Sequence, residues 1–229
     1  MTESSTWPDL APAIAHARRE AFAALEHRKA PELLRAYYDP AGNYAGATFL
    51  ELGPNDPFDV TATDLYALSL LSVNAGPRAG RALLFPGPHR DLVRAALADA
   101  ALPADADLLT ADAETTAAAE LLYLTVRDAL GNRPWVTASK LCARKRPHLF
   151  PVRDSVVTLK RLKLGLDYLI DWQVYQALLG DDELTAALRE VTERAQADVS
   201  FPITEPALRT LDVLLWMTAD PSMRPRLLG

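Results

Sequence analysis

Apolar residues recur along this chain at spacings of three and four, which places them on one face of an α-helix. Leucine, alanine and valine at 184, 187, 188, 191 and 195 show this spacing most clearly. With Pro, Gly and capping residues as boundaries, the pattern predicts helices over 9–28, 31–38, 61–73, 77–84, 88–100, 112–130, 135–145, 184–195 and 204–217. We therefore predict an all-α fold, a single globular domain of about nine or ten helices.

The helical pattern is interrupted at residues 39–59, where Gly, Pro, Asn and Asp occupy turn positions around a short strand-like run, 47–52. A chain of 229 residues can bury about 70 to 75% of its unfolded surface as one domain. The alternative is an arrangement of two helical lobes, with the seam near 101–112 or 131–136.

The cysteine and histidine content excludes several kinds of site. Cys142 is the single cysteine, so no intramolecular disulfide or cysteine-based metal centre can form, and we expect it in the core. No two of the four histidines share a helical turn: His16, His27, His89 and His148. We therefore expect no metal and no cofactor. Phosphate-loop, dinucleotide-binding and nucleophile-elbow motifs are also missing.

No apolar run reaches the roughly 20 residues that a membrane-spanning helix needs, and the N-terminus lacks the pattern of an export signal. We expect a cytoplasmic protein without a membrane partner. A basic amphipathic helix at 158–172 lying on a membrane is a weaker alternative, because Gly165 interrupts it. The sequence leaves the oligomeric state open.

Positive charge is concentrated in one segment of an otherwise acidic chain. The net charge is −6, yet residues 133–163 contain nine Lys or Arg residues and one acid, Asp154. Within "GNRPWVTASKLCARKRPHLFPVRDSVV", residues 131–157, we predict a turn, a helix over 135–145 and an N-cap aspartate at 154. A cap role alone is the simplest interpretation of Asp154. A strand over 152–159 is the alternative, because Val156 and Val157 are β-branched.

The order of turn, Trp135-Val-Thr-Ala, helix and Phe150-Pro-x-x-Asp resembles the core of the helix-hairpin-helix DNA glycosylase superfamily. The resemblance covers about 27 residues and implies that Asp154 matches the catalytic aspartate, with 131–136 as the phosphate-binding hairpin. The sequence "GNRP" departs from the Gly-x-Gly of that hairpin. The lysine of lyase-active members would fall on Trp135 or Val136, which implies a monofunctional enzyme and gives no such role to Lys140.

The whole chain also resembles an uncharacterised actinobacterial domain family, recognisable by "YYDPAGNYAGATFLELG", "TATDLYALSLLSV" and "SKLCARKRPHLFPVRDSVV". This resemblance implies no known activity.

Two functions follow as hypotheses. The first is a nucleic-acid-directed, glycosylase-like enzyme that acts on duplex DNA, with Asp154 catalytic and Trp135 and Phe150, with help from Tyr37 and Tyr38, lining the base pocket. Its phosphate contacts would be Arg133, Lys140, Arg144, Lys145, Arg146 and Arg153. The second is a non-catalytic helical protein that binds an acidic partner or a small molecule through the basic segment 133–163.

Overall fold

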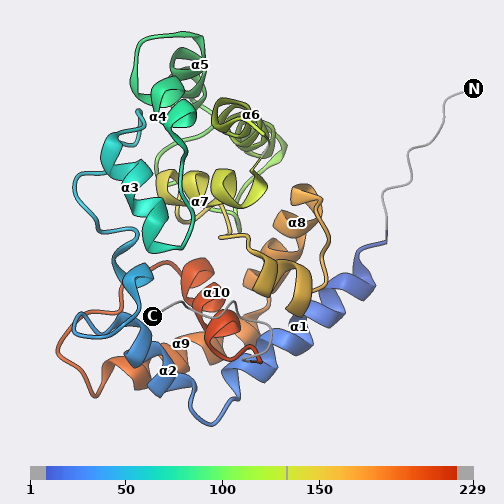
Figure 1. The fold of residues 1–229 in the computed structure, drawn as a ribbon. Helices are drawn as coiled ribbons and strands as arrows, with labels where there is room; N and C mark the ends of the chain where they lie inside the picture. Colours follow the sequence, from blue (N-terminus) through green and yellow to red (C-terminus); the bar gives the residue numbers. More distant parts are fainter. Residues whose placement is uncertain (1–8, 133, 221–229) are drawn as a thin grey trace, which may run out of the picture.

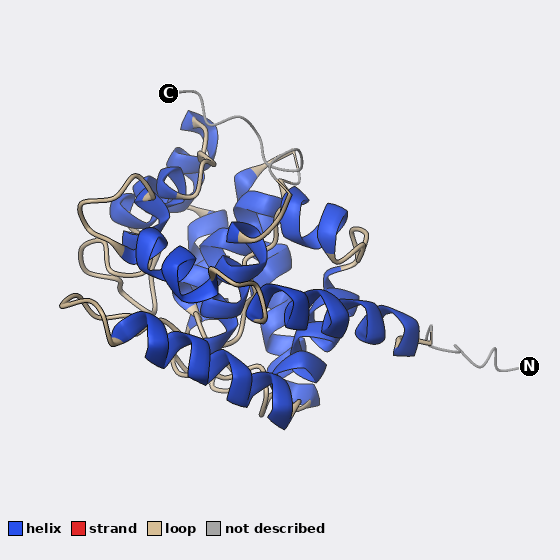
Figure 2. Cartoon of the chain, turned by 90° about the horizontal axis from the view of Figure 1, so that it is seen from below, coloured by secondary structure: helices blue, strands red, loops and turns tan. Residues whose placement is uncertain are grey.

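A computed structural model describes residues 9–132 and 134–220 of the chain, and every regular element in these ranges is a helix (Figure 2). The α-helices are α1 (Ala11–Leu25), α2 (Ala30–Tyr38), α3 (Ala62–Leu70), α4 (Pro77–Leu84), α5 (Pro88–Leu97), α6 (Ala113–Leu130), α7 (Trp135–Lys145), α8 (Tyr168–Leu179), α9 (Asp182–Gln196) and α10 (Ala207–Met217). A 3-10 helix, η1 (Ala45–Thr48), and a π-helix, η2 (Ser155–Arg161), lie between them. The predicted all-α fold is confirmed. None of the described helices could cross a lipid bilayer.

The helices form two groups that are packed together (Figure 1). The middle of the chain, α3 to α7, forms one group, and α1, α2, α8, α9 and α10 form the other. Both linkers proposed as a seam, 101–112 and 131–136, join helices that pack on each other within the first group. The boundary between the groups is therefore crossed after α2 and again before η2.

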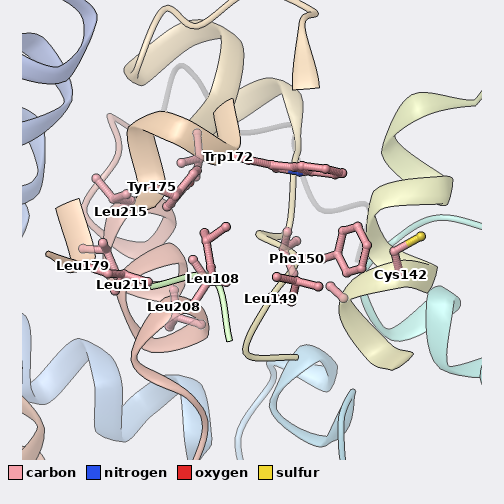
Figure 3. Packing of buried hydrophobic residues seen from close by; sticks show 14 of the residues in the cluster. Leu108, Cys142, Leu149, Phe150, Trp172, Tyr175, Leu179, Leu208, Leu211 and Leu215 are labelled. Carbon is pink, nitrogen blue, oxygen red and sulfur yellow. The ribbon is translucent and has the colours of Figure 1, made fainter. Parts of the chain in front are cut away.

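One continuous hydrophobic core extends through both groups. Figure 3 shows Phe150 between Cys142 of α7 and Trp172 of α8, while Leu211 and Tyr175 continue the core toward α10. Cys142 is fully buried, as predicted, and burial raises the pKa of its thiol. The core thus fixes α7 against the second group.

The strand-like run predicted at 47–52 is wrong: the structure has the 3-10 helix η1 followed by turns. A strand needs a neighbouring strand to accept and donate its backbone hydrogen bonds. Here the carbonyls of Phe49 and Leu52 instead accept hydrogen bonds from the guanidinium of Arg144 on α7. The segment therefore closes over α7 as an irregular loop.

Asp64 is the acceptor that joins α3 to α7 in the interior. It forms a capping box with Thr61, in which each residue accepts a hydrogen bond from the backbone N–H of the other. Asp64 also accepts from Arg144 Nε at 2.7 Å and from Lys145 Nζ at 2.5 Å, and all three side chains are almost fully buried. Burial alone would raise the pKa of Asp64, but Lys145 and the other donors lower it overall.

We expect Asp64→Asn to reduce the free energy of unfolding by about 3 to 5 kcal/mol at pH 7, because it leaves two buried cations without their counter-charge. Urea denaturation monitored by far-UV circular dichroism would measure this loss. The matched control is Asp59→Asn, which breaks a more exposed pair with Arg90 and should have a clearly smaller effect. Equal losses in the two variants would contradict the role given to Asp64.

Candidate functional site

The basic segment lies mostly in the interior of the protein. Arg144, Arg146 and Arg153 are fully buried and Lys145 is 3% exposed, so a phosphate on the surface cannot reach them. Arg144 and Lys145 pair with Asp64, as described above. The prediction that these four side chains contact DNA phosphates is therefore wrong. A helix pattern indicates which residues share a face, but not which neighbours that face meets.

The other two buried arginines also have internal partners. Arg146 donates only to backbone carbonyls, including those of Leu97 at 2.7 Å and Pro57 at 2.9 Å, and burial lowers its pKa. Arg153 pairs with the buried carboxylate of Asp171 and stacks 4.9 Å above the ring of Trp135. Both guanidinium groups hold helices and loops together.

The remaining predicted site residues have different fates. Arg133 lies outside the described residues. Trp135 is half-buried beneath Arg153, and Phe150 packs edge-on against Trp172 with ring centroids 5.2 Å apart. Neither aromatic side chain lines the large cavity described next, so their assignment to a base pocket is corrected.

A cavity of about 350 Å³ lies between the two helix groups. Its wall is formed by the end of α2 and η1, the end of α3, the start of α7, the segment before η2, and α10. Four acidic or basic side chains reach the wall: Lys140, Asp154, Arg209 and Asp212. Thus Lys140 and Asp154, two of the residues predicted for the site, do meet in one cavity.

Asp154 is held by the start of η2. Its Oδ1 atom accepts hydrogen bonds from the backbone N–H groups of Val156 at 2.8 Å and Val157 at 2.7 Å. The predicted cap is confirmed, and the alternative of a strand over 152–159 is not formed. No described residue donates to Asp154 Oδ2, and the side chain is half-buried. Two amide donors stabilise negative charge on this carboxylate.

Lys140 projects from α7 into the same cavity and is 6% exposed. Its ammonium donates to the carbonyl of Leu71, at the end of α3, at 2.8 Å. Burial lowers the pKa of Lys140, and Arg209 lowers it further, while Asp154 and Asp212 oppose the shift. The lysine makes no direct ion pair with either aspartate. It is therefore a buried amine without a contacting counter-ion in the described structure.

Arg209 and Asp212 lie three residues apart on α10 and form a buried pair. Arg209 donates to Asp212 Oδ2 at 2.5 Å and to the hydroxyl of Tyr37 at 2.5 Å. Asp212 Oδ1 has no hydrogen-bond partner among the described residues. Burial raises the pKa of Asp212 to about 7, against the opposing charge of Arg209. Both protonation states of Asp212 are consequently accessible near neutral pH.

Aromatic rings complete the wall. Tyr37 stacks on Tyr44 with ring centroids 5.6 Å apart, and Trp216 meets Tyr44 edge-on at 6.1 Å. Sequence reasoning missed Tyr44, Trp216, Arg209 and Asp212; of these rings it had named only Tyr37 as pocket-lining. Tyr38 was also predicted to line the base pocket, but its hydroxyl donates a hydrogen bond to Glu205 and the residue is not on the cavity wall. The available signal was "ALRTLDVLLWM", an apolar helix interrupted by two opposite charges three residues apart.

The fold and the cavity define a helical protein with two carboxylates and buried cations on the wall of one cavity. The chain matches the model of a family of unknown function, DUF6308, over residues 30–219, and it belongs to that family. This range contains every cavity-lining residue. No curated protein matches the chain, and no solved structure matches it either.

The environment of Asp212 predicts a pH dependence of stability. Its pKa is about 7 in the folded protein and near 3.8 when unfolded, so between pH 4 and 7 the folded state binds more protons. The free energy of unfolding should fall as pH rises through this window, by at most about 1.4 kcal/mol per pH unit for this group. Asp212→Asn should flatten the decline, as measured by urea denaturation at several pH values.

Asp112→Asn is the control for this titration. Asp112 caps α6 on the surface, and its hydrogen bond from the amide of Thr115 lowers its pKa, which places its titration below the window. The slope between pH 4 and 7 should be that of the wild type. Parallel curves for the wild type and Asp212→Asn would contradict the buried, proton-binding state of Asp212.

Proposed function

We propose that the cavity is the active site of a hydrolase that cleaves the glycosidic bond between a nucleobase and its sugar. The observation that supports this most is the presence of two carboxylates, Asp154 and Asp212, in very different environments on the wall of one cavity. Glycoside hydrolysis requires such a pair, with one group ionised and the other able to supply a proton.

Asp154 is suited to the ionised role. As the glycosidic bond breaks, positive charge develops on the sugar carbon and its ring oxygen, and a nearby carboxylate stabilises that charge. The amides of Val156 and Val157 fix Oδ1, which leaves Oδ2 to face the sugar or to accept a proton from an attacking water.

Asp212 is suited to the acid role. Its pKa of about 7 means that a substantial fraction is protonated at neutral pH. A proton passed to a ring nitrogen of the leaving base would leave Asp212 ionised beside Arg209, which stabilises the new charge. In this proposal Asp154 acts as the carboxylate and Asp212 as the acid, because their surroundings differ.

The aromatic wall is suited to a flat ring. Tyr37, Tyr44 and Trp216 offer stacking and edge contacts, and about 350 Å³ is within the range of small-molecule sites. A base within a duplex would have to be flipped out to enter. Four of the side chains predicted to contact phosphates are buried, which weakens the argument for duplex DNA as the substrate. Free nucleosides are therefore tested as substrates together with duplex DNA.

The second hypothesis was a non-catalytic protein that binds an acidic partner or a small molecule, and only small-molecule binding is retained. An acidic partner can no longer dock on the side chains of Arg144, Lys145, Arg146 and Arg153, because they are buried. The same cavity would then bind a ligand without turnover. Base release distinguishes this binding role from hydrolysis.

We expect the protein to release free base from one or more members of a panel of nucleosides and of duplexes that each contain one modified base. Chromatography with mass detection would measure release. Asp154→Asn should lower the rate at least about 100-fold, because general acid–base or charge-stabilising groups contribute about 10² to 10⁴. The fold should persist, since Asn is as good an N-cap as Asp.

Asp112→Asn is the matched control, because it makes the same substitution at a helix cap outside the cavity wall. Its rate should equal that of the wild type. Fluorescence anisotropy with an abasic-analogue duplex at about 50 and 200 mM salt tests the DNA arm, since phosphate contacts weaken with salt. No base release from any substrate, with the protein folded, would overturn the hydrolase proposal.

A further inference from the structure

Helix α7 contains two buried lysines whose environments differ in kind. Lys145 donates to Asn55 Oδ1 at 2.8 Å, to the carbonyl of Asp56 at 2.9 Å and to Asp64 Oδ2 at 2.5 Å. These three bonds use all three protons of an ammonium group. Burial lowers the pKa of Lys145 as well, but the amine contacts the carboxylate of Asp64 and has no donor left for a ligand.

Lys140 lacks this saturation. Its Nζ donates to one described acceptor, the carbonyl of Leu71, although the side chain is as deeply placed as that of Lys145. The charged groups that face it are Asp154, from the segment before η2, and Arg209 and Asp212, from α10. None of the three contacts the amine directly. The unused donor capacity belongs to an amine on the wall of the cavity.

Desolvation and a neighbouring cation are the two conditions that convert a lysine into a nucleophile at neutral pH. Both act on Lys140, where burial and Arg209 lower the pKa. The carboxylates of Asp154 and Asp212 oppose this shift but do not cancel it. The neutral amine is therefore more accessible at Lys140 than at an exposed lysine.

We propose that Lys140 is a nucleophilic amine that condenses with an aldehyde or ketone bound in the cavity. This activity does not depend on glycosidic hydrolysis, and either can exist without the other. The ligand class is a compact carbonyl compound, preferably with a flat ring that Tyr44 and Trp216 can contact.

The reaction proceeds without an oxidant or a reductant. The lone pair of Lys140 Nζ attacks the carbonyl carbon, and one proton moves from nitrogen to the carbonyl oxygen to give a carbinolamine. The nitrogen lone pair then expels the hydroxyl group as water, for which the protonated form of Asp212 supplies a proton. Loss of the remaining proton from nitrogen to a carboxylate gives the neutral imine and one water molecule.

The five lysines of the chain provide the test. The full-length protein is incubated with benzaldehyde and sodium cyanoborohydride at pH 7.5, and peptide mapping measures the rate of reductive alkylation at each lysine. Lys140 should react several-fold faster than exposed Lys29, Lys160 and Lys163, because burial and Arg209 lower its pKa and so increase the fraction of free amine. Lys145, buried and saturated, is the internal control and should remain unmodified.

Variants locate the effect in the cavity. Lys140→Met should abolish the fast component and leave the slow labelling of the exposed lysines unchanged, whereas Asp112→Asn should behave as the wild type. Thermal unfolding shows whether each variant is folded, and the wild-type map remains decisive if Lys140→Met is not. Labelling of Lys140 no faster than that of the exposed lysines would overturn the proposal. Base release measured on the same samples reports on the hydrolase separately.

Discussion

The burial of positive charge on α7 is the constraint on which the rest of this structure depends. A buried guanidinium or ammonium group is stable only when its N–H groups find acceptors, and a buried charge needs a counter-charge or several dipoles. Arg144 obtains them from Asp64 and from the carbonyls of Phe49 and Leu52. The loop that supplies these carbonyls forms η1 and turns instead of a strand. The charges of α7 therefore determine the conformation of a segment some 90 residues earlier.

The same constraint places one wall of the cavity. Asp64 holds α3 against α7, and the end of α3 carries the carbonyl of Leu71 that receives Lys140. On the other side, Arg153 binds Asp171 and so ties the segment before Asp154 to α8. Asp154 consequently reaches the cavity from a position fixed by two independent sets of contacts.

Sequence periodicity was sufficient for the helices but not for the surroundings of α7. Apolar spacing and caps located most elements, including α3. A helix that is buried on all sides is usually apolar all round. Helix α7 is buried over nearly its whole length but carries Lys140, Arg144 and Lys145, so its composition indicated an exposed face. The acceptors that neutralise it lie too far away in sequence for local spacing to predict.

Only part of the candidate site was predicted, again because residues that are distant in sequence meet in the fold. Asp154 was recognisable because a proline, an aspartate and a following helix are adjacent in sequence, whereas its companions on α10 are nearly 60 residues away and occur within an apolar run. Their opposite charges, three residues apart, form a pair that looks self-sufficient.

The Arg209–Asp212 pair on α10 leaves polar atoms without partners. In this it differs from the contacts that Arg144 and Lys145 of α7 make. Arg144 and Lys145 use their donors on acceptors of the chain, but Asp212 Oδ1 and Arg209 Nε have no hydrogen-bond partner in the described residues. An unsatisfied buried polar atom costs about 1 to 3 kcal/mol. Protonation of Asp212 removes the buried negative charge and so reduces the cost of leaving Oδ1 without a donor. The burial that leaves this oxygen without a partner is thus also the cause of the raised pKa of Asp212.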